Sequence, residues 1–374
     1  MSKLDINAKP FDDATLLKLD IFRKCFREWY PVFINHKSIT QIYIYDMFAG
    51  SGTDSDKKYG SPLILLEEAK GNNRQYCSND TNRKKVFFEF NEKIVEKCNQ
   101  LELNVKSYLS NCRKNCNNDC VYSKSIYFTN SEFSEIMDNQ NFIKILNNPK
   151  YAKFILLDQY GFSQITDEVF LKLIKSPTTD FIFFISSSFI RRFKNLEAVK
   201  KYFNTNRIDF IDTKPKECHR VVADYFRNLI PREKEYYINH FTIQKGTNYY
   251  GLIFGTSHSL GMEKFVKVCW NEDHSSGESN CNINDDFEEG SLFYTDETSK
   301  KISVKKELND LILKGEIISN VDGLKFALSK GCEPKLFVEV IDSLYNEKKI
   351  EIIGKFNRQS TNIHKVDEYR IKVL

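Results

Sequence analysis

The sequence predicts an α/β protein built on a mostly parallel sheet with an antiparallel edge hairpin, followed by a small C-terminal unit. Apolar segments of strand length alternate with single segments of helix length between residues 41 and 186. Strands joined through single helices imply right-handed crossovers and parallel pairing. Two later strands flank a short turn that contains Gly246, which predicts the antiparallel hairpin. The predicted strands are Gln41–Asp46, Lys85–Phe90, Ser125–Thr129, Lys153–Asp158, Asp180–Ser186, Phe241–Gln244 and Tyr249–Gly255.

The helices between these strands follow from apolar spacing and from residues that begin or end a helix. Residues 14–34 carry apolar side chains at helical intervals, and Pro31 is expected to end or kink that helix. Ser61 suits the N-cap of the next helix and Pro62 suits its first turn, where the missing N–H group has no cost. The other predicted helices of this part cover residues 91–101, 131–146 and 166–175.

Composition divides the chain into three parts. Residues 1–270 hold the predicted sheet, with a helical cover over 11–36 and a Cys-rich insertion over about 102–123. Residues 271–299 are acidic and weakly periodic, which predicts a linker. Residues 300–374 contain three helical periods followed by two strand-like segments. That order is typical of a winged-helix domain.

Composition also limits the class of protein. The chain has 374 residues, of which 41% are hydrophobic and 28% charged, as in ordinary globular proteins. No apolar run approaches the roughly 20 residues of a membrane span, and the N-terminus lacks the apolar core of a secretory signal, so a cytoplasmic location is expected. The ten cysteines are then expected to be reduced thiols or metal ligands. A net charge of +4 permits nucleic-acid binding without arguing for it.

A glycine loop follows the first predicted strand. Gly50 and Gly52 follow Asp46 within six residues, past the carboxyl end of a strand, where ligands of open α/β sheets bind. The loop departs from the dinucleotide fingerprint because the next helix starts only at Ser61 and the loop is acidic. Acidic residues suit a ligand with an ammonium and a sulfonium group better than a pyrophosphate. The alternative is an ordinary tight turn.

Two more acidic residues lie at or near the ends of predicted strands. Glu89, near the end of the second strand, is placed to accept both hydroxyl groups of a ribose; the alternative is a solvated residue beside a helix N-terminus. Asp158 ends the fourth strand and is closely followed by Tyr160. An acid followed by an aromatic ring resembles the D-P-P-Y arrangement of amino-methyltransferases. The alternative is that Asp158 caps the turn and Tyr160 packs at the sheet edge.

These motifs occur in an order that resembles the three-Cys-motif partner (TcmP) family. The resemblance covers about residues 14–270 and rests on K-L-D-I-F, Y-I-Y-D-M-F-A-G-S-G, G-S-P-L, F-F-E-F, L-L-D-Q-Y-G-F and Y-Y-G-L-I-F-G-T-S-H-S-L-G. It implies a Rossmann-like class I methyltransferase sheet that uses S-adenosylmethionine, a C-terminal winged-helix domain, and a separately encoded partner protein in a mobile-element or antiviral defence context. Two departures are Gln159, where the family has proline, and Thr129-Asn130, where it often has Gly-Asp.

The resemblance also implies roles for individual residues. Asp158 and Tyr160 would form the catalytic motif, and Asn130 would meet the adenine amine. The residues expected to bind the cofactor are Asp46, Phe48, Ala49, Gly50, Gly52, Glu89 and Asn130.

Two functions remain open from the sequence. The first is S-adenosylmethionine-dependent methyl transfer to a base amine of a nucleic acid, in which Asp158 aligns the nitrogen or takes a proton and Tyr160 stacks on a flipped base. The second is a non-catalytic module that keeps the fold and docks DNA or a partner through its winged helix. Turnover separates the two.

A cysteine series lies between the second and third predicted strands. Cys112, Cys116 and Cys120 are spaced by four residues, which matches neither a zinc ribbon nor an iron–sulfur motif. A structural zinc clip and reduced thiols in a variable insertion are the two interpretations.

Basic residues gather in the predicted wing of the C-terminal unit. Lys348, Lys349, Lys355 and Arg358 are the candidates for nucleic-acid contact there. The alternative is that this unit docks on a partner protein.

Overall fold

A seven-stranded sheet forms the centre of the protein in the computed structural model, which describes residues 9–77, 84–116, 120–159, 161–287, 297–356 and 368–374. The strand order is β3-β2-β1-β4-β5-β7-β6, with β1 to β5 parallel and β7 antiparallel to both of its neighbours. The predicted Rossmann-like class I methyltransferase fold with its antiparallel edge hairpin is confirmed. The strands are β1 (Gln41–Asp46), β2 (Lys85–Asn91), β3 (Ile126–Thr129), β4 (Tyr151–Leu157), β5 (Thr179–Ile185), β6 (Tyr237–Lys245) and β7 (Asn248–Thr256).

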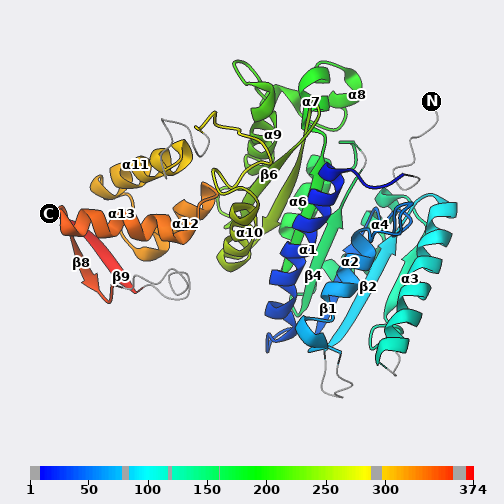
Figure 1. Ribbon diagram of the computed structural model, residues 1–374. Coiled ribbons are helices and arrows are strands. Elements are labelled where there is room, and N and C mark those ends of the chain that lie inside the picture. The colour runs from blue at the N-terminus through cyan, green and yellow to red at the C-terminus, as the bar shows by residue number, and fades with distance from the viewer. Residues whose placement is uncertain (1–8, 78–83, 117–119, 160, 288–296, 357–367) are drawn as a thin grey trace.

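Helices cover both faces of the sheet (Figure 1), because side chains of successive strand residues point to opposite faces. Phe154 of β4, for example, joins one hydrophobic cluster, and its neighbour Ile155 joins the other. The first cluster lies under α1 (Asp13–Ile34), α2 (Ser61–Glu68), α3 (Val95–Cys116) and α10 (Ser259–Glu272). The second lies under α4 (Phe133–Asp138), α5 (Gln140–Leu146), α6 (Asp167–Lys175), α7 (Ser187–Phe193), α8 (Glu197–Lys200) and α9 (Cys218–Arg227). Short 3-10 turns are η2 (Asn72–Arg74), η3 (Thr205–Arg207) and η4 (Pro215–Glu217).

Several helices differ from the prediction. The single helix predicted over 131–146 is divided into α4 and α5 at Asn139, and Ser61 is the first residue of α2, with Gly60 at the N-cap. Pro31 lies inside α1 rather than at its end: the helix continues to Ile34, and the Asn35 side chain donates a hydrogen bond to the Pro31 carbonyl. Helix α3 runs to Cys116, so much of the predicted Cys-rich insertion is helical. Leu101, Val105, Tyr108 and Cys112 are all buried at helical spacing, which explains why the helix extends past the predicted end at residue 101.

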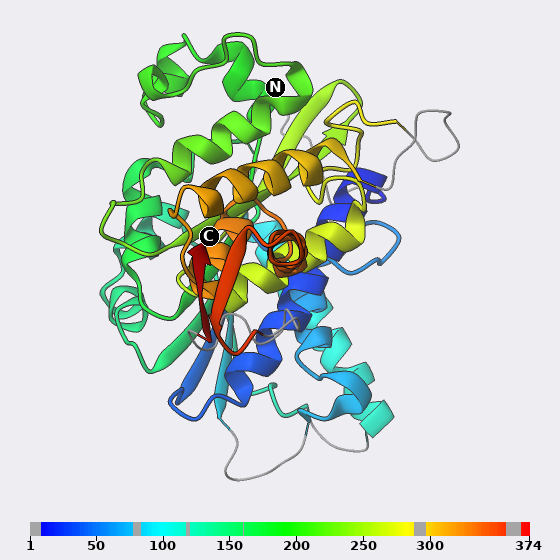
Figure 2. The same cartoon turned by 90° about the vertical axis from the view of Figure 1, so that its left-hand side faces the viewer.

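The C-terminal unit has the predicted order of three helices and a hairpin. The helices are α11 (Ser299–Leu313), α12 (Asn320–Ser329) and α13 (Pro334–Asn346), and β8 (Ile350–Gly354) pairs antiparallel with β9 (Tyr369–Val373). Figures 1 and 2 show this unit beside α10 and β6, away from the far edge strand β3.

The described part of the acidic segment 271–299 is folded against both neighbours. Buried Glu278 pairs with Arg220 of α9 at 2.5 Å and with Lys300 of α11 at 2.8 Å. The Trp270 indole donates a hydrogen bond to the Gly331 carbonyl at 2.9 Å. The C-terminal unit is therefore packed on the sheet domain.

Among the helices that the structure describes, none has both the length and the apolar character needed to cross a membrane.

Candidate active site

The carboxyl ends of three neighbouring strands are joined by one buried side chain, Asn91 at the end of β2. It is 2% exposed, and its amide nitrogen donates to the carbonyl groups of Met47 and Ser131, each at 3.1 Å. Its oxygen accepts from the Thr129 hydroxyl at 3.0 Å and from the Ser131 amide at 3.1 Å. The loops after β1, β2 and β3 are thereby held together at the edge where ligands of such sheets bind.

The glycine loop after β1 has a defined conformation. Gly50 and Gly52 have φ angles of 60° and 81°, which favour glycine. The Gly50 amide donates to the Glu92 carboxylate, just past β2, at 3.0 Å. From α3, the Asn104 amide donates to the Ser51 carbonyl at 2.7 Å. The loop is therefore held on one side by β2 and on the other by α3.

The acidic residue Asp54 in this loop has a structural role. Its carboxylate is 2% exposed and accepts the backbone amides of Phe11, Asp56 and Lys58 at 2.8 to 2.9 Å. From the sequence, the loop acids are candidate partners of a cationic ligand. In the structure, Asp54 instead closes the loop and ties it to the segment before α1.

Asp46 is the carboxylate nearest the start of the loop, and it is completely buried. Its pKa is raised to about 7, mainly by burial and in part by the charge of Asp158, against smaller opposing effects of Ser61, the Phe48 amide and Lys18. Within the described residues no hydrogen bond reaches Oδ2 of Asp46, although the Ser61 hydroxyl is near enough to lower the pKa. A buried carboxylate oxygen of this kind is stabilised by a cationic partner.

Asp158 follows β4, the neighbour of β1, and forms an ion pair that no local sequence pattern indicates. The ammonium of Lys18 on α1 lies 2.7 Å from Oδ1 and 2.5 Å from Oδ2 of Asp158. The Lys18 nitrogen also lies 4.7 Å from the centre of the Phe184 ring. Both side chains of the pair are mostly buried, at 13% and 16% exposed. Any amine that binds this carboxylate must therefore displace Lys18 or share the carboxylate with it.

The loop after Asp158 is held by Gln159, the residue that replaces the family's proline. Gln159 is 1% exposed, and its oxygen accepts from the Gln164 amide at 2.8 Å. The Gly161 carbonyl accepts from the Ser186 amide at the end of β5, at 3.0 Å. These bonds fix the loop where proline would restrict it covalently. Tyr160 lies outside the described residues.

The predicted ribose acid does not lie at the strand end. β2 continues two residues past Glu89 because its pairing with β3 extends to Asn91 opposite Thr129. Glu89 sits between Tyr45 and Tyr127 on the neighbouring strands, and burial raises its pKa. Glu92 is the acid that follows the strand end.

The remaining predicted cofactor residues lie around the same loops. Phe48 packs against Phe133 of α4 with ring centres 5.2 Å apart. Ala49 is 5% exposed and its amide donates to the Asn91 carbonyl at 2.9 Å. The amide nitrogen of Asn130 donates to the carbonyl groups of Glu92 and Lys93, which leaves its oxygen to accept a hydrogen bond.

The cysteine series does not gather into a metal site in the described residues, where no group of three or more potential ligands is arranged to hold an ion. Cys112 and Cys120 are buried, at 5% and 8% exposed. Burial raises the pKa of Cys120, with a smaller lowering from the Tyr122 amide. The side chain of Cys116 lies outside the described residues.

The described residues predicted to contact nucleic acid flank strand β8 of the C-terminal hairpin. Lys348, Lys349 and Lys355 are exposed there, and Lys349 pairs with Glu347 at 2.7 Å. Arg358 lies outside the described residues.

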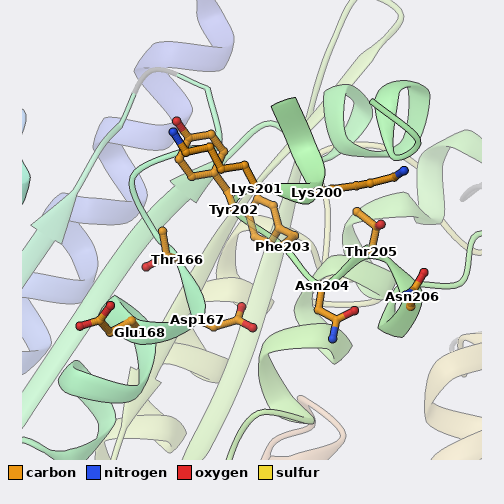
Figure 3. A pocket seen from close by; sticks show the side chains of 10 residues that line it. All are labelled: Thr166, Asp167, Glu168, Lys200, Lys201, Tyr202, Phe203, Asn204, Thr205 and Asn206. Atoms are coloured by element: carbon orange, nitrogen blue, oxygen red, sulfur yellow. The ribbon is translucent and has the colours of Figure 1, made fainter. Parts of the chain in front are cut away.

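A cavity of about 590 Å³ opens between the start of α6 and the segment after α8 (Figure 3). Its lining comes from Thr166, Asp167 and Glu168 on one side and from residues 200–206 on the other. Asp167 is engaged by the Tyr225 hydroxyl at 2.5 Å.

Comparison with solved structures returns methyltransferases at low similarity. The METTL16 MTase domain aligns at 11% identity with a TM-score of 0.31, over 62% of this chain and 66% of that domain, so this chain spans just under two thirds of its length. The N-terminal domain of human METTL16 in complex with SAH aligns at 10% identity with a TM-score of 0.32, over 67% of this chain and 72% of that domain. The plantazolicin methyltransferase BpumL in complex with SAH aligns at 9% identity with a TM-score of 0.33, over 65% of this chain and 86% of that protein.

Neither the models of known protein families nor the curated proteins gave a match. The fold is therefore assigned from the order and direction of the strands.

Proposed function

We propose that the protein transfers a methyl group from S-adenosylmethionine to an amine, with a base of a nucleic acid as the acceptor. The observation that carries the proposal is the pair Asp46 and Asp158, at the ends of adjacent strands β1 and β4. They are close enough that the charge of Asp158 raises the pKa of Asp46. A cationic ligand beside Asp46 would offset both the cost of burying its negative charge and the repulsion from Asp158.

The residues at the strand ends fit the cofactor by charge. S-adenosylmethionine carries a sulfonium and an ammonium group, and Asp46 has a buried oxygen to which no described residue donates a hydrogen bond. The glycine loop over Gly50 and Gly52 would hold its methionine part, Glu89 or Glu92 its ribose, and Asn130 its adenine. The cofactor supplies a methyl group already activated by the positive sulfur, so the protein's contribution is position and electrostatics.

Asp158 has the chemistry to align an acceptor amine or to take its proton. In the structure its two oxygens accept hydrogen bonds from the Lys18 ammonium. The amine that receives the methyl group would take the place of this ammonium. Tyr160 would stack on the acceptor base.

We also propose that the protein acts with a separately encoded partner protein in a mobile-element or antiviral defence context, and that residues 300–374 form a winged-helix domain. The TcmP resemblance supports all three, and the observed helix–helix–helix–hairpin order supports the last. The Lys18–Asp158 ion pair favours the second candidate function, a non-catalytic module, because Lys18 occupies the carboxylate that would otherwise bind the acceptor amine.

Calorimetric titration with S-adenosylmethionine and S-adenosylhomocysteine tests the cofactor site. Micromolar binding is expected, with a large loss in Asp46→Asn and none in the control Asp138→Asn, whose carboxylate is 78% exposed at the end of α4. A labelled-methyl assay over DNA, RNA and protein acceptors follows. Asp158→Asn should retain cofactor binding and lose transfer. Absence of binding at millimolar ligand would contradict the proposal, and binding without any transfer would establish the non-catalytic alternative.

A further inference from the structure

A set of aromatic rings, two of them exposed and two half-buried, lies beside the candidate catalytic loop. Phe162 stacks on Phe189 with ring centres 4.9 Å apart and an interplanar angle of 20°. Phe189 contacts Phe193 at 4.6 Å, and Phe162 meets Tyr202 edge-on at 6.0 Å. Phe189 and Phe193 remain 39% and 38% exposed. These four residues are called the aromatic platform below.

The platform is placed by the same loops that form the site. Phe162 directly follows Gly161, whose carbonyl accepts from Ser186 at the end of β5. Phe189 and Phe193 belong to α7, which begins at the next residue. Figure 1 shows α7 and α8 beyond the end of the sheet at which β5 leads into α7. The platform therefore lies at the same end of the sheet as Asp158.

Cations outnumber acidic residues in the segment that carries three of the four platform rings. Residues 187–207 contain six Lys or Arg residues and one acidic residue, whereas the whole chain has a net charge of only +4. Arg191 donates to the Thr213 carbonyl and Arg192 to the Asn248 side chain. Lys194 lies over the Phe210 ring and Lys201 over the Tyr202 ring. In the part of the chain that the structure describes, no carboxylate forms an ion pair with any of these four cations.

Exposed rings beside cations that form no ion pair are the features by which proteins bind single-stranded nucleic acid. Single-stranded nucleic acids bind by stacking their bases on aromatic side chains while basic residues contact the phosphates. A protein partner would instead favour a surface whose centre is depleted of charged residues. A duplex keeps its bases stacked on one another and cannot offer them to the rings. The cavity of about 590 Å³ adds room beside the platform, because Tyr202 lines it as well.

We propose that the aromatic platform and its cations bind a single-stranded segment of DNA or RNA next to the acceptor base. This inference rests on the proposed function for its orientation, and it names the substrate as single-stranded. It also assigns the main nucleic-acid contact to the sheet domain rather than to the wing lysines.

Fluorescence anisotropy with labelled 12-residue oligonucleotides tests the proposal, using the full chain without cofactor. Single-stranded DNA or RNA should bind more tightly than a duplex of the same sequence. Phe189→Ala and Phe193→Ala should each weaken binding roughly tenfold, as expected for a lost stacking contact. Arg192→Gln should reduce the dependence of affinity on salt concentration. Comparison of DNA and RNA oligonucleotides shows which strand is preferred.

Two controls match these changes. Tyr127→Ala removes a ring that is 50% exposed on the far edge strand β3, and Lys348→Gln with Lys355→Gln removes two wing cations. Both should leave affinity within about twofold. Equal binding of duplex and single strand, or unchanged affinity in the Phe189→Ala, Phe193→Ala double variant, would overturn the proposal.

Cofactor binding and strand binding are separate measurements. Strand binding that depends on the platform, in a protein that fails to bind S-adenosylmethionine, would support this inference and reject the proposed function. Methyl transfer to a protein or a small amine, without strand binding, would reject this inference alone.

Discussion

At the scale of single residues, the candidate site depends on two carboxylates in different electrostatic settings. Asp46 is fully buried, and its pKa is raised to about 7, mainly by loss of solvent. Since the folded-state pKa lies above the ordinary value of 3.8, this group lowers stability progressively as pH rises from 3.8 to about 7. Asp158 is partly buried but is held by Lys18. A cationic ligand therefore has more to gain at Asp46.

The first prediction concerns protons released on cofactor binding. At pH 6.5 Asp46 should be largely protonated, and a cationic ligand should ionise it, so binding should release between about half and one proton. The ligand's own amino group stays charged at this pH. Titration calorimetry in buffers of different ionisation enthalpy measures the release, which should vanish at pH 9 and in Asp46→Asn. A binding enthalpy independent of the buffer would contradict the role of Asp46.

The second prediction concerns Lys18. If the acceptor amine replaces its ammonium on Asp158, Lys18→Gln should lower the KM for the acceptor roughly tenfold and leave kcat nearly unchanged, because a partly buried ion pair no longer has to break. Steady-state methyl-transfer kinetics measure both constants. A fall in kcat with unchanged KM would show instead that Lys18 positions Asp158 for catalysis.

At the scale of elements, helix α3 supports the glycine loop over a distance in sequence that no local motif reveals. Its Asn104 side chain bonds the Ser51 carbonyl at 2.7 Å and the Thr53 hydroxyl at 3.2 Å. On the other side of the loop, Glu92 accepts the Gly50 amide. The conformation of the loop thus depends on two elements that follow it in the chain.

The third prediction tests that support. Asn104→Ala should raise the Kd for S-adenosylmethionine about fivefold, because loss of the hydrogen bonds costs about 1 kcal/mol of loop order. The melting temperature should fall only slightly. Asn99→Ala, an exposed change on the same helix, is the matched control. Calorimetry and thermal melting measure the two effects, and equal Kd values in both variants would refute the role of α3.

At the scale of the whole molecule, Glu278 links three parts of the chain. Its carboxylate meets Arg220 on α9 and Lys300 on α11, and the charge of Lys300 contributes most to lowering its pKa, to about 2, against the opposing effect of burial. Because the folded-state pKa is below the ordinary value of 4.5, this stabilisation is present above pH 4.5 and is lost as pH falls towards 2.

The fourth prediction follows from that link. Glu278→Gln should lower the free energy of unfolding by about 3 kcal/mol at pH 7, since it leaves two cations around a buried site without their counter-charge. The difference from the wild-type protein should shrink below pH 4.5. Glu351→Gln removes a half-exposed partner of Lys372 and should cost less than about 1 kcal/mol. Denaturant unfolding over a pH series measures both, and equal losses would contradict the prediction.

Most of the fold could be predicted from the sequence because strands and helices have local periodicities. Strand β1 lies where the pattern places it, and the edge hairpin and the three C-terminal helices appear in the predicted order. The errors come from contacts outside the local window. α3 is longer than predicted because its extra turns are buried, and β2 passes Glu89 because it pairs with β3.

The order of strands and helices along the chain, and the place of Asp46 and Asp158 at the ends of strands in one parallel sheet, follow from the sequence, since alternating apolar periods specify crossovers and parallel strands bring their ends to one edge. That the strands of Asp46 and Asp158 are neighbours is seen only in the folded sheet. Which charged side chains meet depends on the packing of the folded chain. Lys18 and Asp158 are 140 residues apart, and Arg220 and Glu278 are 58 apart. No local pattern encodes such pairs, because they arise when packed helices bring distant side chains together out of water.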